Sequence, residues 1–191
     1  MQAVIFDCFG VLVREWLAAV AEPYPKEVRE QLWDVVKASN MGFIDFQEGV
    51  RQMAAVLGIT VDELHRVRDK NEVRNEVLLS YILELRHRGY KTAVLSNVSA
   101  GGIGRRFTDQ EVKQYFDVIV ESGAVGVTKP DKNAYNYTAE LLGVVNGECI
   151  MVDDREDFCA GAEAAGMGSL LYVNFEDFKY SLEAKLANTN D

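Results

Sequence analysis

One strand that ends in a carboxylate constrains this chain more than any other feature. The run from Val4 to Cys8 is apolar except for Asp7, and Gly10 follows it closely. A short apolar run bounded by a turn residue is typical of a strand buried on both faces of a parallel sheet. Open α/β sheets bind their ligands beyond the carboxyl ends of the strands, so we expect Asp7 to lie where chemistry takes place. Phe9, and not a second acid, stands two residues after Asp7.

Further apolar runs alternate with helical segments along the rest of the chain. The predicted strands are Val4–Cys8, Lys91–Leu95, Phe116–Val120, Cys149–Val152 and Ser169–Val173. Helical spacing predicts helices over Asn133–Leu142 and Arg155–Ala165, each ended by a glycine. This alternation predicts an α/β fold with a doubly wound parallel sheet and right-handed crossovers.

The chain between the first two predicted strands is helical instead. The helices expected there are Lys26–Ser39, Phe46–Leu57, one that starts at the Thr60–Glu63 capping box, and Val73–Arg88. The sequence therefore predicts an α/β core domain of residues 1–13 and 89–191, with a helical cap domain of residues 14–88 inserted into it.

Composition excludes several classes of protein. The chain has 191 residues with 48% hydrophobic content, enough for a real core, and a net charge of -10 that argues against nucleic-acid binding. Its three cysteines lack the spacing of a zinc site or a disulfide framework. No apolar stretch has the length of a membrane span and no basic, apolar leader opens the chain, so we expect no membrane partner and a cytoplasmic location.

Polar side chains follow four of the predicted strands. In chain order they are Asp7, Ser96 with Asn97, Lys129, and Asp153 with Asp154. Each alone has a simpler interpretation as a turn residue or a helix cap. Because parallel strands share one carboxyl edge, their occurrence together favours a single crevice. A carboxylate nucleophile, a hydroxyl, a lysine and an acid pair suit phosphoryl transfer through an aspartyl-phosphate, and Asp7 with Asp154 is a candidate Mg²⁺ site.

The order and strand context of these motifs resemble the haloacid dehalogenase (HAD) superfamily of hydrolases. The resemblance runs from Val4 to about Val173 and includes a helical cap inserted after the first strand. It is similar to the pattern of sugar-phosphate phosphatases in that superfamily. The resemblance therefore implies a Mg²⁺-dependent phosphoric monoester hydrolase that acts on a small phosphorylated metabolite.

The resemblance also implies a role for each matching residue. Asp7 would be the nucleophile and a metal ligand, and the backbone carbonyl of Phe9 would also bind the metal. Asp154, with Asp153 beside it, would complete the Mg²⁺ site, and we favour Asp154 as the direct ligand.

The substrate would contact the remaining motif residues. Ser96 would hold phosphate oxygens with help from Asn97, and Lys129 would bridge the nucleophile and the phosphate. From the cap, Arg14 and Arg51 are candidate anion contacts.

Phe9 is the departure from the pattern. Phosphatases of this superfamily usually carry a general acid there, a contribution of about a hundredfold to ten-thousandfold in rate. The 2-haloacid dehalogenases carry an aromatic residue at that position and use no metal, because halide leaves without a proton. The acid pair Asp153-Asp154 favours Mg²⁺ chemistry. A metal-independent dehalogenase and a non-catalytic binding protein remain the alternatives.

Overall fold

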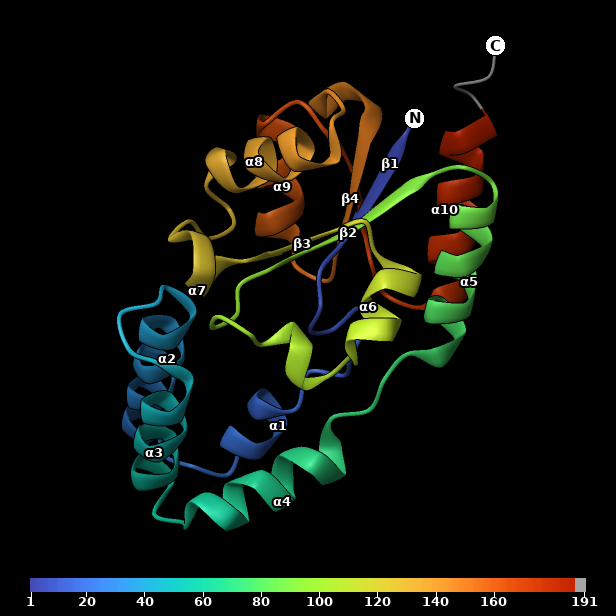
Figure 1. Ribbon diagram of the computed structural model, residues 1–191. Helices are drawn as coiled ribbons and strands as arrows, with labels where there is room; N and C mark the ends of the chain where they lie inside the picture. Colours follow the sequence, from blue (N-terminus) through green and yellow to red (C-terminus); the bar gives the residue numbers. More distant parts are fainter. Residues whose placement is uncertain (188–191) are drawn as a thin grey trace.

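A five-stranded parallel sheet forms the centre of the molecule (Figure 1). The structure is a computed structural model and describes residues 1–187. The strands are β1 (Ala3–Phe6), β2 (Lys91–Ser96), β3 (Val118–Glu121), β4 (Cys149–Asp153) and β5 (Gly168–Leu171). Their order is β3-β2-β1-β4-β5, so β1 lies in the middle between β2 and β4. The predicted doubly wound α/β fold is confirmed, and each strand boundary lies within about two residues of the expected one.

Helices cover both faces of the sheet. Alternate residues of a strand point to opposite faces, so Phe6 packs with α5 (Glu76–His87) and α10 (Phe175–Ala187) on one side. Ile5 packs with α8 (Lys132–Leu142) and α9 (Glu156–Ala164) on the other. With both faces buried, only the ends of the strands are left for ligands.

The segment between β1 and β2 begins with a separate group of helices. They are α1 (Leu17–Ala21), α2 (Lys26–Asn40), α3 (Phe46–Leu57) and α4 (Val61–Asn71), drawn in blue to cyan in Figure 1. These helices enclose their own small hydrophobic cluster around Leu32, Val50 and Leu64. Trp16 belongs to this cluster, whereas Phe43 is 74% exposed. None of the helices within residues 1–187 is long and apolar enough to cross a membrane.

The helix α5 packs with the sheet and not with the four helices before it. Leu78, Leu79 and Ile82 are fully buried in the same cluster as Phe6. The expected cap of residues 14–88 includes this helix, because a helical period shows an apolar face without showing what covers it. We therefore propose that the cap ends near residue 75 and that α5 belongs to the core.

Several short elements lie outside the predicted ones. They are η1 (Ile103–Arg105), α6 (Asp109–Tyr115), α7 (Ser122–Val125) and η2 (Asn146–Glu148). Thr108 and Glu111 do form a capping-box pattern at the start of α6. Helices of one or two turns present too few residues for a periodic pattern and depend on their neighbours for stability. The longer α10 was also not expected; its apolar residues Phe178, Leu182 and Leu186 pack beside α5 on the sheet.

Candidate active site

Asp7 lies one residue beyond the central strand. Its N–H donates to the carbonyl of Val152 in β4 at 2.9 Å, so the sheet holds its backbone. Its side chain is almost fully buried, with 6% of the residue exposed. A buried carboxylate requires a charged or hydrogen-bonding partner.

Lys129 supplies that partner. Its Nζ donates to Asp7 Oδ1 at 2.7 Å and to Asp153 Oδ2 at 2.5 Å. Burial would lower the pKa of Lys129, but the carboxylates of Asp7 and Asp153 raise it above its ordinary value. The lysine therefore stays an ammonium group, and it joins the ends of β1 and β4 with the loop that follows β3.

Three carboxylates gather around this lysine. Asp7, Asp153 and Asp154 each have an oxygen within 4.8 Å of the others, an all-oxygen donor set of the kind that Mg²⁺ prefers. Asp153 uses both oxygens within the protein, one with Lys129 and one with the N–H of Arg155 at 3.1 Å. Asp154 is exposed and its carboxylate accepts its own backbone N–H, so it keeps an oxygen open to a cation.

Burial affects the acid pair strongly. It raises the pKa of Asp153 to about 7, with Lys129 opposing the shift and Asp7 adding to it. It also raises the pKa of Asp154, and the nearby charge of Asp7 adds to the effect. A bound divalent cation would relieve this repulsion, so the residues present fit a metal site.

Gly10 allows the side chain of Asp154 to lie close to the turn that follows Asp7. Its φ of +86° lies in the left-handed region, and a Cβ there would be 2.1 Å from Asp154 Oδ2. Any side chain at this position would displace the carboxylate of Asp154. The glycine is therefore required by the close approach of the two loops.

Ser96 and Asn97 lie at the end of β2 and have different surroundings. Ser96 is 1% exposed, and its Oγ has no hydrogen-bond partner among the described residues. A buried hydroxyl without a partner is unfavourable, so a ligand oxygen is the natural occupant. Asn97 Oδ1 instead accepts the N–H of Lys129 at 2.8 Å, and Asn97 Nδ2 donates to the Lys129 carbonyl at 2.9 Å. Asn97 thus holds the lysine loop, and its expected contact with the substrate phosphate stays a prediction.

The ring of Phe9 packs against the guanidinium of Arg106, a residue to which no sequence motif assigned a role. The Arg106 guanidinium lies 4.5 Å from the centre of the Phe9 ring. Arg106 Nη2 donates to Glu72 at 2.9 Å, and Arg106 Nη1 donates to the carbonyl of Gly102 at 2.7 Å. The sequence does contain a signal for the Arg106–Glu72 pair: Glu72 follows the helix α4, and Arg105 and Arg106 are adjacent basic residues.

The structure does not bring the expected cap arginines to the carboxylates. Arg51 pairs with Glu48 on its own helix at 2.5 Å, and Arg14 is exposed.

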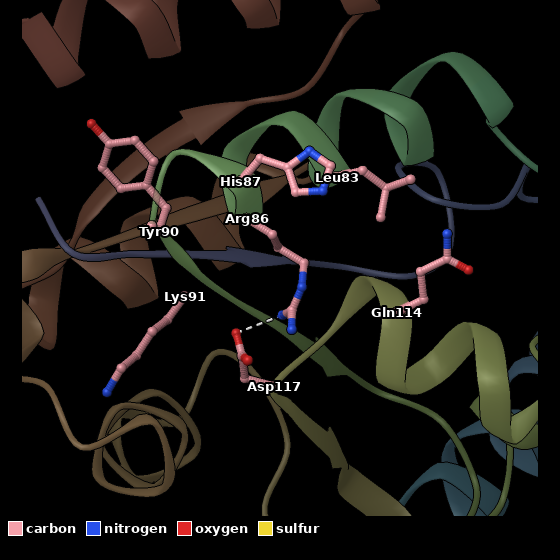
Figure 2. Close-up of a pocket in the computed structure, with 8 residues that line it drawn as sticks. Leu83, Arg86, His87, Tyr90, Lys91, Gln114 and Asp117 are labelled. Carbon is pink, nitrogen blue, oxygen red and sulfur yellow. Dashed lines mark ion pairs between the residues drawn. The ribbon is translucent and has the colours of Figure 1, made fainter.

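A cavity of about 510 Å³ lies away from the carboxylates, at the amino end of β2, where Lys91 and Gln114 line it (Figure 2). Arg86 and Asp117 in that cavity already form an ion pair of 2.7 Å.

Comparisons with known proteins give a family match, curated relatives and solved structures of similar fold. A family model described as haloacid dehalogenase-like hydrolase matches residues 1–166. Phosphatase MT3486 of Mycobacterium tuberculosis is 38% identical over 89 residues, which are 46% of this chain and 41% of that protein, so the match spans less than half of that relative. Phosphorylated carbohydrates phosphatase of Thermotoga maritima is 27% identical over 203 residues, 96% of this chain and 91% of that protein.

A solved structure shares the fold over almost the whole chain. The HAD family enzyme bt-2542 from Bacteroides thetaiotaomicron superimposes with a TM-score of 0.77 and 20% identity, covering 95% of this chain and 98% of the other. That enzyme has also been crystallised with magnesium and inorganic phosphate.

Proposed function

Because the chain belongs to the haloacid dehalogenase-like hydrolase family, we propose that it is a Mg²⁺-dependent phosphatase. Its substrate would be a small phosphorylated metabolite, hydrolysed through an aspartyl-phosphate on Asp7. The observation that carries the proposal is the buried Lys129 ammonium, which holds one oxygen of Asp7 at 2.7 Å beside the acid pair. Relatives named as phosphatases support the same reaction class.

The first step is attack by the carboxylate. Lys129 holds Asp7 Oδ1, so Asp7 Oδ2 is the oxygen that forms a bond to phosphorus while the ester P–O bond breaks. Water then attacks phosphorus, the bond to Asp7 breaks, and inorganic phosphate leaves with the carboxylate restored. Each step needs the charge on the phosphoryl oxygens to be offset.

Residues already in place provide part of that offset. The ammonium of Lys129 lies beside the reacting carboxylate, and the unpartnered Oγ of Ser96 can donate to a phosphoryl oxygen. Asp7, Asp154 and the carbonyl of Phe9 would hold Mg²⁺, whose charge would stabilise the phosphoryl oxygens. Asp153 and Asn97 would act on the substrate only through Lys129, by positioning it.

Phe9 limits the leaving group. A general acid at that position would contribute about a hundredfold to ten-thousandfold in rate, and an aromatic ring contributes none. The leaving oxygen must therefore depart as a stable anion or take its proton from water or from the substrate. We expect esters of acidic alcohols and phenols to be turned over faster than esters of simple alcohols.

The cluster of three carboxylates favours this function over a metal-independent dehalogenase. Such a reaction needs one nucleophilic carboxylate and no metal, so Asp154 beside Asp7 would only add repulsion there. The same cluster, with a buried lysine already on the nucleophile, favours catalysis over simple binding.

An aryl phosphate assay tests the proposal. We expect Asp7→Asn to lower kcat on p-nitrophenyl phosphate by about a thousandfold or more. We also expect chelation to abolish activity and added Mg²⁺ to restore it. Asp157→Asn is the matched control, because Asp157 is exposed and its ion pair in the described residues is with Arg155 and not with Lys129 or Asp7. Turnover retained by Asp7→Asn, or turnover indifferent to chelator, would contradict the mechanism.

A further inference from the structure

Arg105 lies between the core and the cap. It is the last residue of η1, in the segment that follows β2 and Ser96, and Figure 1 shows this segment between the sheet and the cap helices. Its Nη2 donates to Ser99 Oγ at 2.9 Å, and Nη1 and Nη2 both make long hydrogen bonds of 3.4 Å to the carbonyl of Ala100. Its guanidinium lies 3.5 Å from the ring centre of Phe46, the first residue of α3. The charge therefore stands at the junction of the two modules.

Neighbouring arginines at this junction have carboxylate partners. Arg106 pairs with Glu72 at 2.9 Å, and Arg68 pairs with Asp69 at 2.8 Å. Within residues 1–187, Arg105 has no carboxylate oxygen closer than the 4.0 Å that defines an ion pair.

Glu121 is the carboxylate whose charge acts on Arg105, and it already has other partners. Its carboxylate accepts the backbone N–H groups of Gly101 at 2.6 Å and Ile103 at 2.7 Å. Burial lowers the pKa of Arg105, and the charges of Arg106 and Arg68 lower it further, while Glu121 opposes them. Arg105 is thus the arginine of this group whose guanidinium has no ion-pair partner in the described part of the chain, which leaves it able to take an added anion.

This charge shares the edge of the sheet with the nucleophile. Glu121 pairs in register with Ser96, so both mark the carboxyl ends of their strands. The adjacent Arg106 covers the ring of Phe9, two residues from Asp7. A substrate whose phosphate meets Asp7 would extend toward the cap along this edge.

We propose that Arg105 binds a second anionic group of the substrate, a carboxylate or another phosphate. The inference rests on the proposed phosphatase function and narrows its substrate class to phosphate monoesters that carry a further negative charge. The planar fork of a guanidinium suits two-point contact with either anion. The competing interpretation is that Arg105 only clamps Phe46 and the Ser99 loop.

Matched pairs of esters separate these interpretations. We would measure kcat/KM with Mg²⁺ for 3-phosphoglycerate against glycerol 3-phosphate, and for fructose 1,6-bisphosphate against fructose 6-phosphate. In at least one pair we expect kcat/KM for the more charged ester to exceed kcat/KM for the less charged ester by about tenfold or more. Arg105→Gln should reduce that ratio by a similar factor, and Arg105→Lys by less. Phe46→Leu removes the ring contact but keeps the guanidinium, and should preserve the ratio.

Two results would overturn the inference. One is a wild-type ratio near one in both pairs, and the other is a ratio that Arg105→Gln leaves unaltered, as a clamp would require. Absence of turnover with all four esters and with p-nitrophenyl phosphate would instead overturn the proposed function. Calorimetric binding of the same esters to Asp7→Asn would then decide the role of Arg105. If adding Arg105→Gln to that variant weakens binding of only the more charged ester, the result supports the inference. Equal loss for both esters contradicts it.

Discussion

At the scale of single residues, the buried charges of Asp7, Lys129 and Asp153 depend on one another. Lys129 is 2% exposed, and its ammonium is bonded to both carboxylates. Each carboxylate would be costly to bury without the lysine, and the lysine would be costly without them. The same contacts that stabilise the loop therefore leave Asp7 ready to react.

We predict that Lys129→Met costs both stability and activity. Removing the ammonium leaves Asp7 and Asp153 buried without their partner, a loss of about 3–5 kcal/mol in unfolding free energy. Denaturant unfolding at pH 7 measures this loss. Lys132→Met, at an exposed position nearby, is the control. A Lys129→Met protein with wild-type stability would show that the three charges do not act as a unit.

Ser96→Ala should separate activity from stability. The Oγ of Ser96 has no partner in the described part of the chain, so its removal breaks no hydrogen bond and relieves an unsatisfied polar atom. We predict an unchanged or slightly raised Tm together with kcat/KM lowered about tenfold to a hundredfold on aryl phosphate. A clear fall in Tm would mean that Ser96 has a structural partner in solution.

At the scale of elements, the segment around Arg74, which connects α4 to α5, is tied to α6. Arg74 Nη1 donates to Glu111 at 2.7 Å, and its guanidinium lies 4.8 Å from the centre of the Phe107 ring. Glu111 also closes a capping box with Thr108 at the start of α6. The cap's exit is therefore anchored to a short helix of the core.

This anchor predicts a specific pH dependence of stability. The N–H of Thr108 lowers the pKa of Glu111 to about 2, with Arg74 contributing. A lowered folded-state pKa gives stability that is present above the unfolded value of about 4.3 and is lost as pH falls toward 2. Glu111→Gln should lower the unfolding free energy at pH 7 and reduce its slope between those values. Glu140→Gln, an exposed glutamate on α8, should keep the wild-type slope, and identical slopes for both variants would contradict the anchor.

Sequence patterns predicted the positions of helices and strands better than the tertiary contacts that these elements make. The bounds of α3 are those expected, because Asp45 caps its start and Gly58 ends it in a left-handed conformation. That α5 packs on the sheet could not be predicted, because a local sequence pattern does not show which distant residues cover the apolar face of a helix. The hydrogen bonds of Asn97 and the contact of Arg105 with Phe46 likewise depend on segments that lie far apart in the sequence.

At the scale of the whole molecule, the cap meets the core at several places, and the contact of Arg105 with Phe46 is one of them. The two linkers pair with each other, since Arg14 N donates to Val73 O and Asn75 N donates to Leu12 O, both at 2.8 Å. Elsewhere, Ser122 Oγ donates to the carbonyl of Asn40 at the end of α2, at 2.5 Å. We propose that these contacts hold the cap over the carboxyl edge of the sheet and so limit water there during phosphoryl transfer.

The central claim is that Asp7 carries the phosphoryl group, and a trapped intermediate tests it most directly. Borohydride reduces an acyl phosphate to an alcohol, so quenching during turnover with Mg²⁺ should convert Asp7 to homoserine. Peptide mass spectrometry would locate that change at residue 7, and it should be absent without substrate. Turnover of the ester with Asp7 unmodified at every time point, or with another residue modified, would contradict the account.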